Sequence, residues 1–375
     1  MMKTHHIIFL TIITAFLTGM LGGYIVAPEH EVVERVENHF SYTLQDGYNT
    51  TYFQTFYNNH KQSVAHIKVY KVVDGERRTS QGTGFVIRED GVLATNEHVV
   101  QDAQHIEVKM MDNEWYTAEI LGIDTYSDLA VLEIDETGLQ VLDIAENNPE
   151  PGTVVKALGS PLGLEGTITQ GIVSGVNRTI RTEGRTIPDA VQTDASIDPG
   201  NSGGPLLGDT GEVVGINTAK RGENIGFAIS PALLNRILPK LIEEGEYRHP
   251  YLGVNTFKVT PSVAERNNVD TEGVMVVNVE PEGPSSNVLR GASRIHRSSL
   301  MTVPIGGDII LEAEGTEILN EQDLNSFLVR NKSPGEEVEF KVLRRGLTGY
   351  RETKVTVELG ERPRGEETAG IALRS

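Results

Sequence analysis

The chain contains no cysteine among its 375 residues. This absence excludes disulfide scaffolds, thiolate zinc sites, iron–sulfur clusters and cysteine nucleophiles. Basic residues are scarce too, because 33 lysines and arginines stand against 53 aspartates and glutamates and leave a formal net charge of -20. A surface of that sign repels phosphate backbones, so the composition argues against nucleic-acid binding. The length and the 38% of hydrophobic residues favour two folded domains.

The N-terminus carries the one long uncharged stretch, residues 7–27, which follows Lys3. At ~1.5 Å per helical residue, this stretch spans the ~30 Å hydrocarbon layer of a bilayer, so we expect a signal anchor, a single transmembrane helix, in residues 1–27. The acidic residues that follow favour a single-pass cell-membrane protein whose remainder is extracytoplasmic. A signal peptide cleaved after Ala27 is the alternative, and it places the remainder on the same side of the membrane.

Aromatic residues are concentrated just after this stretch, because residues 40–57 hold seven of them. Such a density in a polar segment needs a surface to cover it. We therefore expect residues 28–60 to form an extracytoplasmic linker and aromatic segment, with a short amphipathic helix at residues 52–64. This helix either lies on the following domain or makes a subunit contact.

Residues 61–245 are predicted to form the first domain. Short runs rich in β-branched residues are separated by Gly, Asp and Asn between residues 64 and 229, with almost no helical period. This pattern predicts an all-β barrel or sandwich. A helix is expected at its end, with Ser230 as the N-cap, Pro231 at the first helical position, a kink at Pro239 and Gly245 as the stop.

Residues 246–360 mix both kinds of pattern. Strand-like runs occur at residues 273–279, 308–311, 337–343 and 353–359. They alternate with helical stretches at residues 284–289 and 321–329, the second with Asn320 as its N-cap. We expect a small α+β domain, followed by a flexible tail at residues 361–375.

The sharpest motif is GNSGGP at residues 200–205. Glycines on both sides of a serine allow a tight turn that can bring the N–H groups of Gly200 and Ser202 to one point, where an oxyanion would be held. The string also satisfies the G-x-S-x-G pattern of α/β-hydrolases, so an esterase of that kind remains an alternative on this motif alone.

The order of the other candidates separates these alternatives. A hydrolase elbow needs an acid and a histidine after the serine, but only two histidines follow Ser202, and both lie in polar segments. Upstream, His98 lies in TNEHVV after an apolar strand, and Asp128 lies in SDLAVL just before another strand. The order His98, Asp128, Ser202 is that of chymotrypsin-like barrels.

With these three motifs, their order and the trailing domain, the sequence resembles the HtrA/Deg family of trypsin-like serine proteases, in its membrane-anchored, DegS-like form. The resemblance implies an all-β, chymotrypsin-like double β-barrel followed by one PDZ domain. It also implies a serine endopeptidase in which Ser202 attacks a peptide carbonyl, His98 takes the proton and Asp128 orients the imidazole. The expected substrates are unfolded or damaged extracytoplasmic proteins, and neither a cofactor nor a metal is expected.

The same resemblance indicates a specificity pocket. The residue six before the nucleophile lies at the base of the primary pocket in this fold, and here it is Ser196 rather than an acid, which disfavours cleavage after Arg or Lys. Ile197, Ile225 and Phe227 are expected to line a shallow apolar pocket for small aliphatic side chains. For Phe227, simple packing inside the barrel is the alternative. The family usually has Asn at the position of Asp198.

A short string in the C-terminal domain, YLGV at residues 251–254, is similar to the carboxylate-binding loop of PDZ domains. Tyr251, Leu252, Gly253 and Val254 would hold the C-terminus of a peptide that adds as a strand beside the helix at residues 321–329. An ordinary β-turn would give the same string.

Regulation and assembly are also expected from the resemblance. Arg178 and Arg181 lie in a basic segment at residues 177–189, expected to be a loop that relays peptide binding at the PDZ domain to the oxyanion loop; a mobile surface loop is the alternative. A homotrimer built through the aromatic segment is expected. The alternative function is a membrane-tethered peptide-binding chaperone or stress sensor with little proteolysis.

Overall fold

The computed structural model describes residues 50–110, 113–160, 166–182, 185–220, 222, 224–297 and 302–363. The chain divides into two units, Met1–Tyr57 and Asn58–Ser375. The expected anchor at residues 1–27 and most of the aromatic segment lie outside the described residues, as does the tail after residue 363. Within the described ranges, no helix is both long and apolar enough to cross a bilayer.

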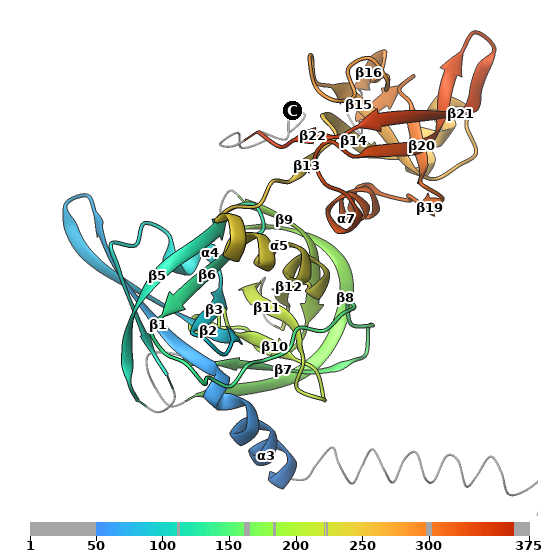
Figure 1. Cartoon of the computed structure of the whole chain (residues 1–375). Coiled ribbons are helices and arrows are strands. Elements are labelled where there is room, and N and C mark those ends of the chain that lie inside the picture. Colours follow the sequence, from blue (N-terminus) through green and yellow to red (C-terminus); the bar gives the residue numbers. More distant parts are fainter. Residues whose placement is uncertain are drawn as a thin grey trace, which may run out of the picture. The chain divides into compact units, whose positions relative to one another are not determined.

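The second unit begins with a closed antiparallel barrel, drawn in blue to teal in Figure 1, in which the strands follow the order β1-β2-β3-β6-β5-β4. Asp74 and Gly75 connect the first two strands with positive φ angles of 55° and 80°, as a two-residue hairpin requires. The barrel is built from β1 (Val64–Val73), β2 (Glu76–Arg88), β3 (Val92–Thr95), β4 (His105–Lys109), β5 (Trp115–Asp124) and β6 (Leu129–Ile134).

A second closed barrel follows, drawn in green in Figure 1, with the order β10-β11-β12-β9-β8-β7. Its members are β7 (Val154–Gly159), β8 (Thr167–Thr182), β9 (Arg185–Thr193), β10 (Pro205–Leu207), β11 (Val213–Lys220) and β12 (Gly226–Ile229). The strand pairs of both barrels are antiparallel, which excludes the parallel sheet of an α/β-hydrolase. The predicted all-β fold is confirmed.

The expectation of a loop at residues 177–189 was wrong. This segment continues β8 and β9 as a long hairpin, with pairs from Arg178 and Ala190 to Thr182 and Arg185. Repeated register shifts accompany the positive φ angles of Asn177 and Asp189, 56° and 54°. These irregularities remove the simple polar–apolar alternation that would have marked two strands.

One helix precedes the barrels in the sequence and another follows them. Before β1 lie α3 (Thr50–His60) and a 3₁₀ turn (Lys61–Ser63), so the predicted helix at residues 52–64 ends earlier than expected. After β12 comes α5 (Pro231–Glu244), with the predicted caps: the Ser230 hydroxyl accepts from the Leu233 N–H, and Gly245 has a φ of 79°. The helix continues through Pro239 and packs against β5, β6 and β11.

The C-terminal domain has a sheet in the order β14-β15-β18-β20-β21, which leaves β14 at an edge beside α7. Asn320 caps α7 by accepting from the N–H groups of Gln322 and Asp323. This confirms the predicted α+β mixture. The elements are β13 (Pro250–Tyr251), β14 (Val254–Lys258), α6 (Pro261–Asn267), β15 (Val274–Val279), β16 (Arg294–Arg297), β17 (Thr302–Ile305), β18 (Ile309–Ala313), β19 (Thr316–Glu317), α7 (Glu321–Asn331), β20 (Glu337–Gly346), β21 (Gly349–Glu358) and β22 (Gly360–Glu361).

The helix predicted at residues 284–289 is not formed. The segment is a series of turns in which Val288 and Leu289 both donate to the Ser285 carbonyl. The Ser285 hydroxyl donates to the Leu252 carbonyl at 2.6 Å, and the backbone N–H of Arg290 donates to the Asp308 carboxylate. The polar groups therefore bond to neighbouring segments, and the chain completes one turn only.

Candidate active site

His98 lies on α4 (Glu97–Val100), the short helix that follows β3. The turn at Asp128 holds this helix in place from the side. The Asp128 carbonyl accepts hydrogen bonds from the Glu97 N–H and from the Asn96 side chain, at 3.2 and 3.0 Å. Asp128 has a φ of 59°, in the left-handed region that Asp adopts more readily than most residues. These hydrogen bonds connect the two segments independently of the contact between the side chains of His98 and Asp128.

The side chains of His98 and Asp128 do meet. Nδ1 of His98 lies 3.0 Å from Oδ1 and 2.8 Å from Oδ2 of Asp128, and the His98 backbone N–H donates to Oδ1 at 3.0 Å. The Asp128 side chain is 2% exposed. Because a carboxylate only accepts, the geometry assigns the proton of a neutral imidazole to Nδ1. Nε2 is then left as the basic nitrogen.

Ser202 lies in the turn that precedes β10, and this turn is held against the segment that carries His98. The Ser202 carbonyl accepts from the Thr83 N–H at 2.9 Å. A Cβ on Gly203, whose φ is 83°, would collide with the Thr83 carbonyl and the Thr95 hydroxyl and would lie 3.2 Å from the Asn96 nitrogen. Only glycine allows this approach, which brings the serine turn to the chain two residues before His98.

One strand, β11, joins the serine turn to Asp128. The Asn217 carbonyl on β11 accepts from the Gly203 N–H at 2.8 Å. The next residue, Thr218, donates its hydroxyl to Oδ2 of Asp128 at 2.5 Å. Consecutive residues of β11 thus bind the serine turn and the aspartate.

The expected oxyanion donors lie in an ordered turn. Gly200 has a φ of 116°, and its carbonyl accepts from the Thr83 hydroxyl at 2.6 Å. Within the described part of the chain, no backbone carbonyl accepts from the N–H groups of Gly200 and Ser202. An amide pair in this state can receive an oxyanion.

The four residues expected in the specificity pocket differ in burial. Ile197 and Phe227 are buried, Ser196 is exposed, and Ile225 is 37% exposed. Ile197 packs against the β12 backbone, since a Cβ on Gly226 would lie 2.5 Å from its side chain. Burial of Phe227 agrees with barrel packing.

An ion pair adjoins this region. Asp198 receives a hydrogen bond from Lys220 at 2.5 Å and another from the Ser196 hydroxyl at 2.7 Å. These two bonds, with that of Lys220 first, lower the pKa of the Asp198 carboxyl. The backbone N–H of Asp198 also donates to the Asn201 side chain at 2.9 Å. The charge that Asp198 adds to the oxyanion loop is therefore paired.

Sequence reasoning missed two residues at the candidate site. Thr218 binds Asp128 as described, and Arg185 of β9 donates to Oδ1 of Asp128 at 2.8 Å. Arg185 also pairs with Glu97 at 2.6 Å. Neighbouring residues in the sequence carried no signal for these contacts, because Thr218 and Arg185 are separated from Asp128 by 90 and 57 positions.

The two arginines expected to relay regulation lie on the β8–β9 hairpin. Arg178 donates to the Gln192 side chain across the hairpin at 3.2 Å. Burial raises the pKa of the Glu321 carboxyl at the start of α7, and the charge of Arg181 opposes this effect. The hairpin also binds α7 through Asp189, which accepts from Nε of Arg330 at 2.7 Å.

The string expected to bind a carboxylate leads into the free edge of β14. Leu252 is buried in the core of the domain, and its carbonyl accepts a hydrogen bond from the Ser285 hydroxyl. Gly253 has a φ of 71°, and its carbonyl accepts from the Glu280 N–H at 2.9 Å. The open side of β14 faces no other strand in the described sheet. An extended peptide could therefore pair there, beside α7.

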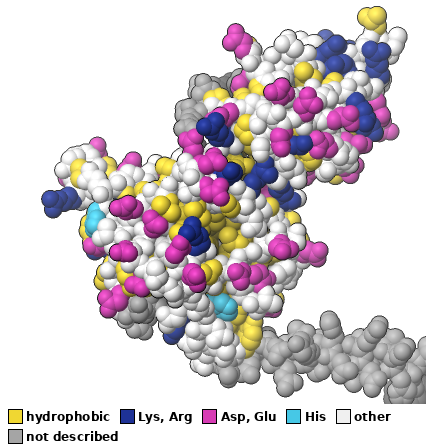
Figure 2. Space-filling model, in the orientation of Figure 1, with side chains coloured by type: hydrophobic (Ala, Val, Ile, Leu, Met, Phe, Trp, Pro, Cys, Tyr) yellow, Lys and Arg dark blue, Asp and Glu magenta, His cyan; other side chains and the backbone are white. Residues whose placement is uncertain are grey.

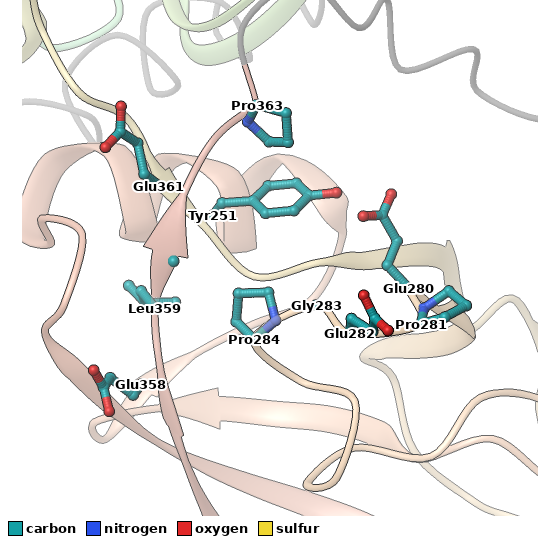
Figure 3. Close-up of a pocket in the computed structure, with 11 residues that line it drawn as sticks. Tyr251, Glu280, Pro281, Glu282, Gly283, Pro284, Glu358, Leu359, Glu361 and Pro363 are labelled. Atoms are coloured by element: carbon teal, nitrogen blue, oxygen red, sulfur yellow. The ribbon is translucent and has the colours of Figure 1, made fainter.

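Tyr251 instead lines a shallow depression of about 550 Å³ on the C-terminal domain. Figure 3 shows its ring in the middle of this depression. Four carboxylates stand around it, from Glu280, Glu282, Glu358 and Glu361. A peptide carboxylate would be repelled there. No residue of β14 lines the depression, so it is distinct from the open edge of that strand. Acidic side chains are also scattered over the face of the molecule in Figure 2.

Comparisons with known proteins agree with both domains. A model of the trypsin-like peptidase domain matches residues 82–216, and a model of the PDZ domain matches residues 250–359. The chain is 35% identical over 302 residues to a "Probable periplasmic serine endoprotease DegP-like" of Halomonas elongata, covering 79% of this chain and 59% of the relative. It is 35% identical over 293 residues to "Protease Do-like 1, chloroplastic" of Arabidopsis thaliana, covering 75% and 64%. The chain thus spans about three fifths of the length of these curated relatives.

Solved structures match over nearly their full length. The "HtrA-type protease AlgW with tripeptide" is 31% identical, with a TM-score of 0.67 and coverage of 83% of this chain and 97% of that one. A serine endoprotease from Yersinia pestis is 31% identical, with a TM-score of 0.58 and coverage of 84% and 99%. Two barrels, one trailing PDZ domain and this likeness agree: the chain belongs to the HtrA family of trypsin-like serine proteases with a PDZ domain.

Proposed function

We propose that this chain is a serine endopeptidase that hydrolyses unfolded or damaged proteins outside the cytoplasm. The observation that carries the proposal is the buried Asp128 carboxylate bonded to Nδ1 of His98, with the Ser202 turn held against the same segment. Relatives named as periplasmic serine endoproteases support the compartment.

Each side chain has a defined role in the proposed reaction. Nε2 of His98 removes the proton of the Ser202 hydroxyl as the oxygen attacks the peptide carbonyl, and it then protonates the leaving amine. Asp128 keeps the imidazole in the required tautomer and stabilises its protonated form. The N–H groups of Gly200 and Ser202 hold the oxyanion, and each contributes about 3 kcal/mol. Water then hydrolyses the acyl-enzyme by the same steps.

The test is the replacement Ser202→Ala, with Ser286→Ala in the PDZ domain as the matched control. Labelling by a fluorophosphonate and degradation of unfolded casein should be lost in the first variant and retained in the second. Mapping of the labelled peptide should return Ser202. Labelling at another serine, or casein degradation by Ser202→Ala, would refute the assignment.

A peptide-binding chaperone or stress sensor is the second candidate, and the open edge of β14 favours it. The two functions predict different behaviour of Ser202→Ala. A separate holding function would protect an aggregating client as well in this variant as in the wild type. Loss of both activities together would leave proteolysis as the sole function.

For specificity, we propose a preference for small aliphatic residues before the cleaved bond. Ser196 offers no carboxylate to a basic side chain, Asp198 is already paired with Lys220, and Ile225 adds exposed apolar surface beside the buried Ile197. Peptides that differ only in this residue, valine against lysine, give the measurement. Faster cleavage after lysine would contradict the proposed pocket.

We further propose that a C-terminal peptide binds at residues 251–254 and β14, and that the β8–β9 hairpin relays its binding. The support is the placement of Arg181 near Glu321 on α7 and the bonding of Arg178 within the hairpin. Arg181→Ala should abolish activation by a hydrophobic C-terminal peptide and keep the basal rate. Equal activation of the wild type and the variant would refute the relay.

The proposed assembly is a homotrimer anchored by residues 1–27. Its support is the uncharged length of residues 7–27 and the aromatic density of residues 40–57. Membrane fractionation of the full chain, and light scattering with and without residues 28–60, test the two parts separately. An unchanged mass after removal of residues 28–60 would contradict the role of the aromatic segment.

A further inference from the structure

Arg185 shares the Oδ1 oxygen of the Asp128 carboxylate with His98. It opens β9, and its side chain is 16% exposed. Nη1 donates to Oδ1 of Asp128 at 2.8 Å, while Nη2 lies 2.6 Å from Oε2 of Glu97 and donates to Gln101 at 3.2 Å. The guanidinium therefore bridges two buried carboxylates, one of which holds the imidazole.

This contact completes the surroundings of Asp128. A carboxylate offers about four acceptor positions. Here they receive the His98 backbone N–H, the His98 ring, the Thr218 hydroxyl and Arg185. The carboxylate is thus bonded from α4, β11 and β9 together, and rotation about its side-chain bonds would break several bonds at once. Arg185 is the one cation in this set.

On the basis of the proposed serine-protease function, we propose that Arg185 is a positioning residue for the His98–Asp128 pair: it fixes the carboxylate toward the imidazole and makes protonation of the imidazole less favourable. Two distances support the second effect. The His98 ring and the guanidinium both lie within 3.0 Å of the same Asp128 oxygen. A protonated ring and Arg185 would therefore be like charges in close range.

The other charged groups around the pair act in a known direction. Glu97 on α4 and Asp102 just after it are the other acids, and Arg185 is the base; Asp102, Arg185 and the pair itself all act on the Glu97 carboxyl. Burial raises the pKa of the Glu97 carboxyl, and Arg185 opposes this effect. Removal of Arg185 would favour protonation of the Glu97 carboxyl, whereas Asp128 would keep its hydrogen bonds to His98 and Thr218. The negative charge of Asp128 would then act on the imidazole without compensation.

The experiment measures the pH dependence of kcat/KM with an unfolded protein or peptide substrate for Arg185→Met, Arg185→Lys and Gln101→Ala. The acidic limb reports protonation of the general base in the free enzyme. Arg185→Met should move the midpoint of this limb to higher pH by about one unit, because a neighbouring cation has been removed. Its kcat at the plateau should fall roughly three- to tenfold with KM unchanged, since the carboxylate has lost one restraint.

The two other variants separate charge from bonding. Arg185→Lys keeps the charge but lacks the planar fork that reaches both acids, so the midpoint should return to the wild-type value and kcat should recover in part. Gln101→Ala removes only an exposed partner of Arg185 and should match the wild type. If Arg185→Met does not fold, Arg185→Lys still decides: a wild-type kcat refutes positioning, and a shifted midpoint refutes the effect of the charge.

A purely structural salt bridge predicts something else: a lower melting temperature with no movement of the midpoint. That result, or a midpoint displaced to lower pH, would overturn the inference. Ser202→Ala in the same assay distinguishes the two levels of the argument. If Ser202→Ala is inactive and Arg185→Met keeps the wild-type midpoint, only the role of Arg185 fails. If Ser202→Ala still hydrolyses the substrate, the proposed function itself fails.

Discussion

Replacement of Thr218 by valine would test how the second barrel supports the proposed reaction. Thr218 is buried, and its hydroxyl donates to Oδ2 of Asp128 at 2.5 Å. Valine has nearly the same shape and lacks the hydroxyl, so the change removes one donor and leaves the packing almost intact. Oδ2 then keeps His98 as its remaining partner.

The magnitude follows from the number of donors. A hydrogen bond to a charged group contributes about 1.5–3 kcal/mol. Asp128 retains its bonds to His98 and Arg185, and the remaining partners absorb part of the loss. We therefore expect the lower end of this range to appear in the barrier. A rise of about 1.4 kcal/mol corresponds to a tenfold fall in kcat/KM.

The assay is steady-state hydrolysis by Thr218→Val, with Thr218→Ser as the control that keeps a hydroxyl at the same position. The serine variant should stay within about twofold of the wild type, because the donated hydrogen bond is preserved. Thermal unfolding checks that both variants are folded. A folded Thr218→Val enzyme with wild-type kcat/KM would show that the orientation of Asp128 does not depend on β11.

Three further predictions concern other parts of the chain. Lys220→Met should lower kcat/KM by no more than about fivefold, as measured by hydrolysis, because its pair with Asp198 steadies the oxyanion loop but is exposed. Burial is the main cause that lowers the pKa of the His66 imidazole below 6.5. The unfolded chain therefore binds more protons than the folded chain, and the free energy of unfolding falls as the pH drops below this value. Denaturant titrations should show a weaker fall for His66→Gln. Asn320→Ala removes the cap of α7 and should cost about 1 kcal/mol in denaturant unfolding.

The fold was predictable where the sequence repeats a local rule. Runs of β-branched residues broken by Gly, Asp and Asn matched the strands of both barrels, and capping residues marked the start of α5 and α7. The failures have local causes as well. The helix α6 is only seven residues long, and the β8–β9 hairpin is interrupted by register shifts. Neither segment is long and regular enough to show the hydrophobic periodicity from which a helix or a strand is predicted.

Only part of the candidate site was predictable from the sequence. His98, Asp128 and Ser202 were singled out because their motifs and order are distinctive, and the structure joins the first two directly. Thr218 and Arg185 were missed because an isolated threonine or arginine on a strand has no distinctive surroundings in the sequence. Their importance arises only when β9 and β11 close the second barrel beside Asp128.

The division of the site between the barrels explains why neither barrel alone could hold it. The first supplies His98 and Asp128, and the second supplies Ser202 together with the Thr218 hydroxyl and the Arg185 guanidinium. The backbone N–H and the hydroxyl of Thr83 cross from the first barrel to the serine turn. A shift of one barrel against the other would break these bonds together. The geometry of the pair and of the serine is therefore a property of the contact between barrels, and conditions that loosen this contact should reduce activity before either barrel unfolds.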